Sequence, residues 1–172
     1  MRAGEPPSQH SAAVTAYVAL GANLGDSQVA IRQAMAALDE LPLTRVTRRS
    51  SLYQTAPLAS GGAQPARGAD YINAVVELQT GLAAPLLLQQ LQRLEQAAGR
   101  ERPYLDAPRT LDLDLLLYGS GQIFSVELTL PHPRMWQRAF VLLPLAEIAP
   151  ALVSAEQLAA VAQQVIQRLE EG

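Results

Sequence analysis

The stretch "RTLDLDLLLYG", Arg109 to Gly119, places leucine at every odd position from Leu111 to Leu117, with Asp112 and Asp114 between the leucines. In a helix, side chains two residues apart point about 200° away from each other, so these two carboxylates would not face the same way. In a strand they stand on one face, with Cα atoms roughly 6.5–7 Å apart. The alternation, and the glycines that follow it, favour the strand.

Two carboxylates held on one face of a strand can share one or two hard cations. The same Asp-x-Asp pattern also fits a strand that simply turns one face to water, and for an isolated pair that interpretation is the more common one. The acidic pair therefore indicates a metal site only if other residues support it.

Patterns of strand and helix alternate through the rest of the chain. Strands are predicted at residues 15–20, 44–55 and 70–80, and helices from Asp26 or Ser27 to about Glu40 and from Pro85 to Gly99. With the acidic strand, the order is strand, helix, strand, strand, helix, strand. This order is the ferredoxin-like βαββαβ motif, an α+β fold with an antiparallel sheet. Extra C-terminal helices are expected, the last with a capping box at residues 154–157 and a buried stripe of Leu158, Val161, Val165 and Leu169.

Length and composition set limits on the domain organisation and the function. The 172 residues suit a single domain at residues 14–172 after a flexible tail at residues 1–13. A net charge of −3 argues against general binding to nucleic acid or to an anionic membrane. The chain has no cysteine and no signal-peptide pattern at its start, so a cytoplasmic protein is expected, and we expect a monomer. All 13 basic residues are arginine, which excludes the lysine-dependent Walker A loop.

Five motifs occur in a fixed order with fitting spacing: "GANLGD", "SSLYQTAPL", "DYINAVVEL", "PRTLDLDLLLYG" and "LTLPHPRMWQRAFVLLPLAEIAP". Together they resemble the 6-hydroxymethyl-7,8-dihydropterin pyrophosphokinases of the folate pathway, over about residues 15–152. The resemblance implies transfer of pyrophosphate from MgATP to the hydroxymethyl group of a reduced pterin, with release of AMP. "LDAPR" departs from many relatives, which have an aromatic residue and a glycine before "PR".

The resemblance also implies roles for individual residues. Asp112 and Asp114 would bind two Mg²⁺ ions, and the predicted catalytic set adds three arginines that hold the ATP phosphates, Arg100, Arg102 and Arg109. The implied pterin-binding residues are Thr55, Ala56, Pro57, Leu58, Tyr71, Asn73 and Phe140. The implied ATP-binding residues are Gln92, Glu95, Arg100, Arg109, Leu115, Thr129, His132 and Arg138. Outside this context each would be interpreted as core, turn or solvated surface.

The competing hypothesis is a non-catalytic ferredoxin-like module that binds a small ligand. Such a module does not need two metal-spaced aspartates beside an arginine, or a Tyr-x-Asn pair on one strand face. Pterin-dependent release of AMP from MgATP separates the two hypotheses. No general base is evident, and pyrophosphoryl transfer needs none if the reactants are positioned and their charge is neutralised.

Overall fold

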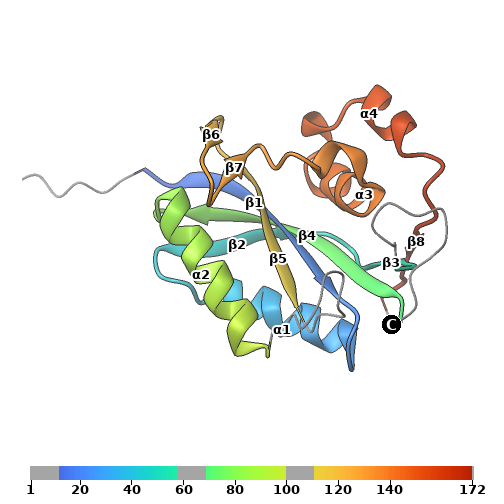
Figure 1. Ribbon diagram of the computed structural model, residues 1–172, viewed down its shortest axis with the longest axis horizontal. Helices are drawn as coiled ribbons and strands as arrows, with labels where there is room; N and C mark the ends of the chain where they lie inside the picture. Colours follow the sequence, from blue (N-terminus) through green and yellow to red (C-terminus); the bar gives the residue numbers. More distant parts are fainter. Residues whose placement is uncertain (1–11, 58–68, 100–110, 172) are drawn as a thin grey trace, which may run out of the picture.

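The computed structural model describes residues 12–57, 69–99 and 111–171 (Figure 1). The first part of the chain forms β1 (Val14–Ala22), α1 (Ser27–Asp39), β2 (Thr44–Arg49), β3 (Tyr53–Thr55), β4 (Tyr71–Thr80), α2 (Ala84–Ala97) and β5 (Asp112–Tyr118). The second part forms β6 (Ile123–Phe124), β7 (Thr129–Leu130), a 3-10 turn (Met135–Gln137), α3 (Ala139–Ile148), a 3-10 turn (Pro150–Leu152), α4 (Ala155–Ala160) and β8 (Gln167–Arg168). Within the described ranges, none of the helices has the length and apolar character needed to span a bilayer.

Six of the strands in the described residues form one antiparallel sheet in the order β5-β1-β4-β3-β8, with β2 paired to β4 beside β3. This arrangement confirms the ferredoxin-like prediction. The predicted caps are also present: Asp26 accepts a hydrogen bond from the Val29 N–H at 3.1 Å and so begins α1. Gly99, with φ of 81°, follows the end of α2.

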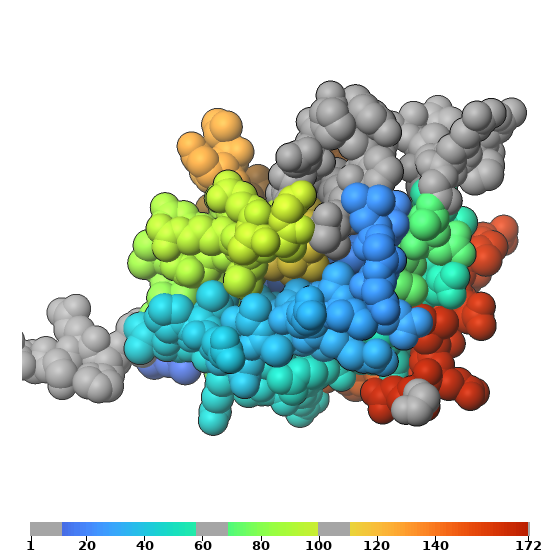
Figure 2. Space-filling view, turned by 90° about the horizontal axis from the view of Figure 1, so that it is seen from below, coloured from blue at the N-terminus to red at the C-terminus, as the bar shows by residue number. Residues whose placement is uncertain are grey.

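The two faces of the sheet carry separate apolar clusters. One face packs against α1 and α2, which lie side by side across it (Figures 1 and 2). The other face packs against α3, which contributes Val141, Leu142 and Leu145 to a cluster with Tyr17 and Val75. Strand residues therefore alternate between a face covered by two helices and a face covered in part by one helix.

The alternation in β5 holds for the first residues and then shifts. Leu111, Leu113 and Leu115 are buried on the α1/α2 face, so Asp112 and Asp114 both lie on the α3 face, which confirms the prediction that the two aspartates share one face of a strand. The register with β1 slips between Tyr17 and Val18, so that Leu117 follows Leu116 onto the α3 face instead of joining Leu115 on the other. Leucine at every odd position of the sequence therefore does not mean that Leu117 shares a face with the three leucines before it.

The predicted strand at residues 44–55 is two strands, β2 and β3, that pair with opposite ends of β4. Ser50 makes the break. Its N–H donates to the Val75 carbonyl at 2.9 Å, and its hydroxyl accepts the Val75 N–H at 2.9 Å in place of a backbone carbonyl. The side chain of Ser50 thus gives the Val75 N–H of β4 a hydrogen-bond partner where the backbone ladder is interrupted.

The C-terminal helix is shorter than the apolar pattern predicts. The capping box between Ser154 and Gln157 is confirmed, but α4 ends at Ala160. Val161 is buried, whereas Val165 is 89% exposed, so the predicted stripe through Val165 is wrong. The segment is extended at Gln167–Arg168, where it forms β8 along the edge of β3, and these backbone hydrogen bonds replace the helical ones.

Candidate active site

A row of four paired residues crosses the α3 face of the sheet at one end. Asp112 on β5 pairs with Gly21 on β1, Gly21 pairs with Asn73 on β4, and Asn73 pairs with Tyr53 on β3. Neighbouring strands lie about 4.8 Å apart, so the Cα atoms of Asp112 and Asn73 are about 10 Å apart, with Gly21 between them. Paired residues stand on one face of a sheet, which places the predicted metal ligand and the predicted pterin ligand on the same surface.

Asp112 and Asp114 are both half-buried on this face, next to each other along β5. Their partners on β1 are small: Asp112 stands beside Gly21 and Asp114 beside Ala19. In the part of the chain that the structure describes, three or more acidic or imidazole groups are not gathered around one metal position. Two carboxylates nevertheless suit Mg²⁺, which keeps several waters and takes its other ligands from substrate phosphates.

The segment between β7 and α3 brings further predicted residues to the same end of the sheet. The His132 N–H donates to the Leu116 carbonyl on β5 at 2.9 Å. Burial lowers the pKa of His132, as do the charges of Arg138 and Arg134, while the nearby Asp112 acts in the opposite direction. The charges of Asp112 and Arg138 therefore both act on the imidazole of His132, in opposite directions.

The imidazole of His132 has a defined orientation. Its Nδ1 accepts a hydrogen bond from the Arg134 N–H at 3.2 Å, so a neutral ring carries its proton on Nε2. Nε2 is therefore available as a hydrogen-bond donor. Beside it, the Arg138 guanidinium lies 5.3 Å from the centroid of the Phe140 ring, a cation–π distance that couples these two predicted site residues.

The predicted pterin residues of β3 and β4 also lie together. Tyr71 and Asn73 share the α3 face of β4, since Ile72 between them and Ala74 after them are buried in the cluster under α1 and α2. Asn73 is 5% exposed, and its amide donates to the Thr55 hydroxyl at 3.0 Å. Tyr71 pairs with Thr55 in the register of β3 and β4. Ala56 and Pro57 follow Thr55 directly.

Several predicted ATP-binding residues lie elsewhere in the fold. Gln92 is exposed on α2, while Glu95 is 3% exposed and accepts the Leu113 N–H at 3.3 Å, so Glu95 is not the solvated residue that composition suggests. Leu115 points into the α1/α2 cluster, on the opposite face from the aspartates. Thr129 lies on β7, where its hydroxyl contacts the Ser125 carbonyl at 3.5 Å.

Four predicted residues lie outside the described part of the chain: Leu58, Arg100, Arg102 and Arg109. The geometry adds one position that the sequence reasoning treated only as a strand end. Gly21 separates Asp112 from Asn73, and a Cβ at this position would stand 3.4 Å from the Asn73 Oδ1. The "GANLGD" motif was the signal that pointed to it.

Residues 17–150 match the model of the family described as 7,8-dihydro-6-hydroxymethylpterin-pyrophosphokinase (HPPK). The chain belongs to this family. It is 43% identical over 133 residues to the 2-amino-4-hydroxy-6-hydroxymethyldihydropteridine pyrophosphokinase of Bacillus subtilis, covering 77% of this chain and 77% of that protein. It is also 43% identical over 140 residues to the protein of the same name from Haemophilus influenzae, covering 81% of this chain and 84% of that one. The predicted family is therefore confirmed.

Solved structures agree on the fold of this HPPK-family chain. The crystal structure of wild-type Plasmodium falciparum HPPK-DHPS matches 83% of the chain with a TM-score of 0.61 at 16% sequence identity. The match covers 39% of that longer chain, so the present chain spans about two fifths of it. At 16% identity this similarity shows the fold alone. It supports the ferredoxin-like fold in addition to the strand order of the sheet.

Proposed function

We propose that this HPPK-family chain transfers the pyrophosphoryl group of MgATP to the hydroxymethyl group of 6-hydroxymethyl-7,8-dihydropterin and releases AMP, a step of folate biosynthesis. The observation that carries the proposal is the row Asp112–Gly21–Asn73 across one face of the sheet. It places the Cα of Asp112, with the Asp114 carboxylate next along β5, about 10 Å from the Cα of Asn73, so that carboxylates for a metal-bound triphosphate and an amide suited to a heterocycle lie on one face. The relatives named as pyrophosphokinases favour this reaction over a non-catalytic module.

The phosphate side of the proposed site consists of Asp112, Asp114, His132 and Arg138. The two aspartates would hold Mg²⁺, and two ions are proposed, as the resemblance implies. When bound, magnesium neutralises phosphate charge and holds the triphosphate chain in a fixed orientation. His132 would donate from Nε2 to a phosphate or ribose oxygen, and the guanidinium of Arg138 would contact phosphate oxygens.

The pterin side consists of Tyr71, Asn73, Thr55 and Phe140. The hydrogen bond from Asn73 to Thr55 fixes the plane of the amide, which can then present both an acceptor and a donor to the polar edge of the pterin. The Tyr71 and Phe140 rings would stack on the two faces of the heterocycle. Ala56, Pro57 and Leu58 would complete this side through the segment that follows β3.

In the proposed reaction, the hydroxymethyl oxygen of the pterin attacks the β-phosphorus of ATP. A bond forms between that oxygen and the β-phosphorus, the bond from the β-phosphorus to the oxygen shared with the α-phosphate breaks, and AMP leaves with the electron pair. The hydroxyl proton passes to solvent. The residues contribute by positioning the two reactants and by compensating charge, which suffices for phosphoryl-type transfer.

The test is AMP release from MgATP with and without 6-hydroxymethyl-7,8-dihydropterin, for wild type, Tyr71→Ala and a matched control, Gln96→Ala, on the exposed face of α2. Wild type and control should release AMP only with the pterin, and Tyr71→Ala should raise the KM for pterin by about tenfold, the loss of roughly 1.4 kcal/mol of stacking. A folded wild-type protein that binds pterin without releasing AMP would establish the binding-module alternative instead.

The proposal includes the setting in which the protein works. Residues 14–172 would act as a single domain, as a monomer in the cytoplasm, on small-molecule substrates and without nucleic acid. The net charge of −3 supports the last point, because a phosphate-binding protein of this charge has little general attraction for polyanions. Size-exclusion chromatography at several protein concentrations tests the monomer: a mass that rises with concentration would contradict it.

A further inference from the structure

The end of β3 forms one side of the proposed pterin site, yet β3 is short. It spans Tyr53–Thr55 and pairs with three residues of β4, among them Tyr71 and Asn73. Thr55 accepts the hydrogen bond that orients the Asn73 amide. Three residues of ladder give a strand few backbone hydrogen bonds, so other contacts must keep β3 in place beside β4.

The break before β3 leaves a backbone group that the β4 ladder does not satisfy. Ser50 still bonds to Val75, but the N–H of Ser51 turns away from β4 and donates to the Glu147 Oε1 at 2.9 Å. The Ser51 hydroxyl donates to the same oxygen at 2.7 Å. A carboxylate from the end of α3 thus takes the place of a strand partner at the break.

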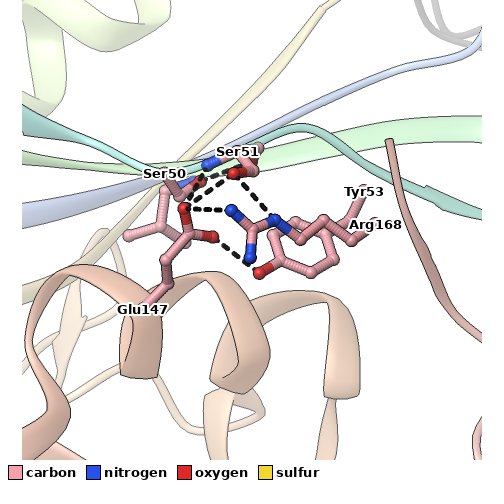
Figure 3. A network of polar contacts seen from close by, with 6 residues as sticks. Ser50, Ser51, Tyr53, Glu147 and Arg168 are labelled. Carbon is pink, nitrogen blue, oxygen red and sulfur yellow. Dashed lines mark hydrogen bonds and ion pairs between the residues drawn. The ribbon is translucent and has the colours of Figure 1, made fainter. Parts of the chain in front are cut away.

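Glu147 also holds the first residue of β3. The Tyr53 hydroxyl donates to the Glu147 Oε2 at 2.6 Å (Figure 3). One carboxylate oxygen thus binds Ser51 at the break, and the other binds Tyr53 at the start of β3. Tyr53 is 6% exposed and is the residue that pairs with Asn73. Hydrogen bonds to a carboxylate are shorter and about twice as strong as neutral ones.

Arg168 reaches this network from β8, on the outer edge of β3. Its Nε donates to the Ser51 hydroxyl oxygen at 3.0 Å, and its Nη2 lies 3.8 Å from the Glu147 Oε1. The Arg168 side chain is 64% exposed and that of Glu147 is 25% exposed, so solvent weakens this ion pair. The hydrogen bonds from Ser51 and Tyr53 therefore hold Glu147 more firmly than the charge of Arg168 does.

We propose that Glu147 is a positioning residue for pterin binding: by holding Ser51 and Tyr53 it places the end of β3 beside Asn73 and so sets the width of the pterin side of the site. The inference rests on the proposed function, since it takes Thr55 and Asn73 to be pterin contacts. Glu147 itself touches neither substrate. Its removal should therefore weaken pterin binding and leave the phosphate side, built from β5 and the start of α3, unchanged.

The experiment compares the KM for pterin, the KM for ATP and kcat in wild type, Glu147→Gln, Tyr53→Phe, Tyr71→Ala and Glu40→Gln, with each rate corrected for the folded fraction. Glu147→Gln should raise the KM for pterin by about five- to tenfold, and Tyr53→Phe, which removes one of the three bonds, by about two- to threefold. The KM for ATP and kcat should stay within about twofold. Glu40, exposed at the end of α1, is the matched control, and Glu40→Gln should leave all three constants at their wild-type values.

The outcomes separate the inference from the function on which it rests. If Tyr71→Ala raises the KM for pterin while Glu147→Gln and Tyr53→Phe leave it unchanged, the positioning role is refuted and the pterin site stands. If Tyr71→Ala also leaves it unchanged, the proposed pterin site itself fails. Equal increases in both KM values for Glu147→Gln would mean general loosening of the fold, which also refutes the inference. If Glu147→Gln does not fold, Tyr53→Phe decides by the same criteria.

Discussion

The substitution Asp112→Asn should stop catalysis and leave the protein folded. Asparagine keeps one acceptor oxygen and the size of the side chain, and removes the charge. Asp112 is half-buried on the open part of the α3 face, outside both apolar clusters, so the substitution creates no cavity. The effect should therefore fall on the metal-dependent step and not on the core.

The expected change in stability follows from the geometry of β5. Asp112 and Asp114 are two residues apart on one strand face, and two unit charges about 7 Å apart repel by roughly 0.6–2.4 kcal/mol for effective dielectric constants of about 80 to about 20. Neutralising one of them should thus raise the free energy of unfolding, by at most about 2 kcal/mol. Loss of one metal-binding carboxylate removes several kcal/mol of transition-state stabilisation, and about 4 kcal/mol lowers kcat/KM by about 10³-fold.

The assay is pterin-dependent AMP release at saturating MgATP, combined with urea unfolding to measure stability. Asp39→Asn is the control, since the Asp39 Oδ1 accepts the Val46 N–H at 2.8 Å and asparagine preserves that acceptor. Asp39→Asn should keep wild-type activity. A value of kcat/KM for Asp112→Asn within tenfold of wild type, in a folded protein, would refute the assignment of the metal to this pair.

Two further predictions concern the C-terminal part of the chain. The Gln164 amide accepts the Ala139 N–H at 2.9 Å and donates to the Gln137 carbonyl at 2.8 Å. Gln164→Leu should therefore lower the free energy of unfolding by about 1 kcal/mol and the Tm by about 2–4 °C, and should raise the KM for ATP because Arg138 lies between these two contacts. Gln163→Leu, at an exposed neighbouring position, should change neither the Tm in thermal melts nor the KM for ATP in kinetic assays. Burial raises the pKa of Glu147, but the hydrogen bonds from Tyr53 and Ser51, with Arg168, outweigh it and bring this pKa below its ordinary value of 4.5. The stability from these bonds should be complete above about pH 4.5 and lost as the pH falls through the lowered pKa. The difference in unfolding free energy between wild type and Glu147→Gln should therefore shrink as the pH is lowered below about 4.5. A difference that stays constant with pH would contradict the hydrogen-bond assignment.

Local sequence signals predicted most of the ferredoxin-like core, because the physics of those elements is local. The period of β5 placed Asp112 and Asp114 on one face, and the cap at Asp26 and the glycine at position 99 set the ends of the helices. Each of these features depends on residues that are only a few positions apart in the sequence. The same holds for Tyr71 and Asn73, whose spacing alone puts them on one face of β4.

The features that the sequence did not reveal depend on contacts between distant residues. The break at Ser50 requires Val75 on the neighbouring strand, and the shortening of α4 requires β3 as a partner for Gln167 and Arg168. The spacing of Val165 fits a buried helical stripe. The spacing gives no information about the edge of β3, which offers the backbone after α4 other hydrogen-bond partners. The burial of Glu95 likewise depends on the N–H of Leu113, 18 positions away.

The size of the side chains along β1 explains why the site lies at this end of the sheet. On the α3 face the strand presents Tyr17, then Ala19, then Gly21, so the side chains shrink in the direction of Asp112 and Asn73. Tyr17 and Ala19 pack under α3, whereas Gly21 lies in the row between the carboxylate and the amide. A larger residue at position 21 would fill the space between the two halves of the proposed site. Its Cβ would already lie 3.4 Å from the Asn73 Oδ1. β1 therefore has no side chain at the position between Asp112 and Asn73, where the phosphate chain and the pterin hydroxymethyl group would meet in the proposed reaction. The proposed functional side chains come from the strands on either side of β1.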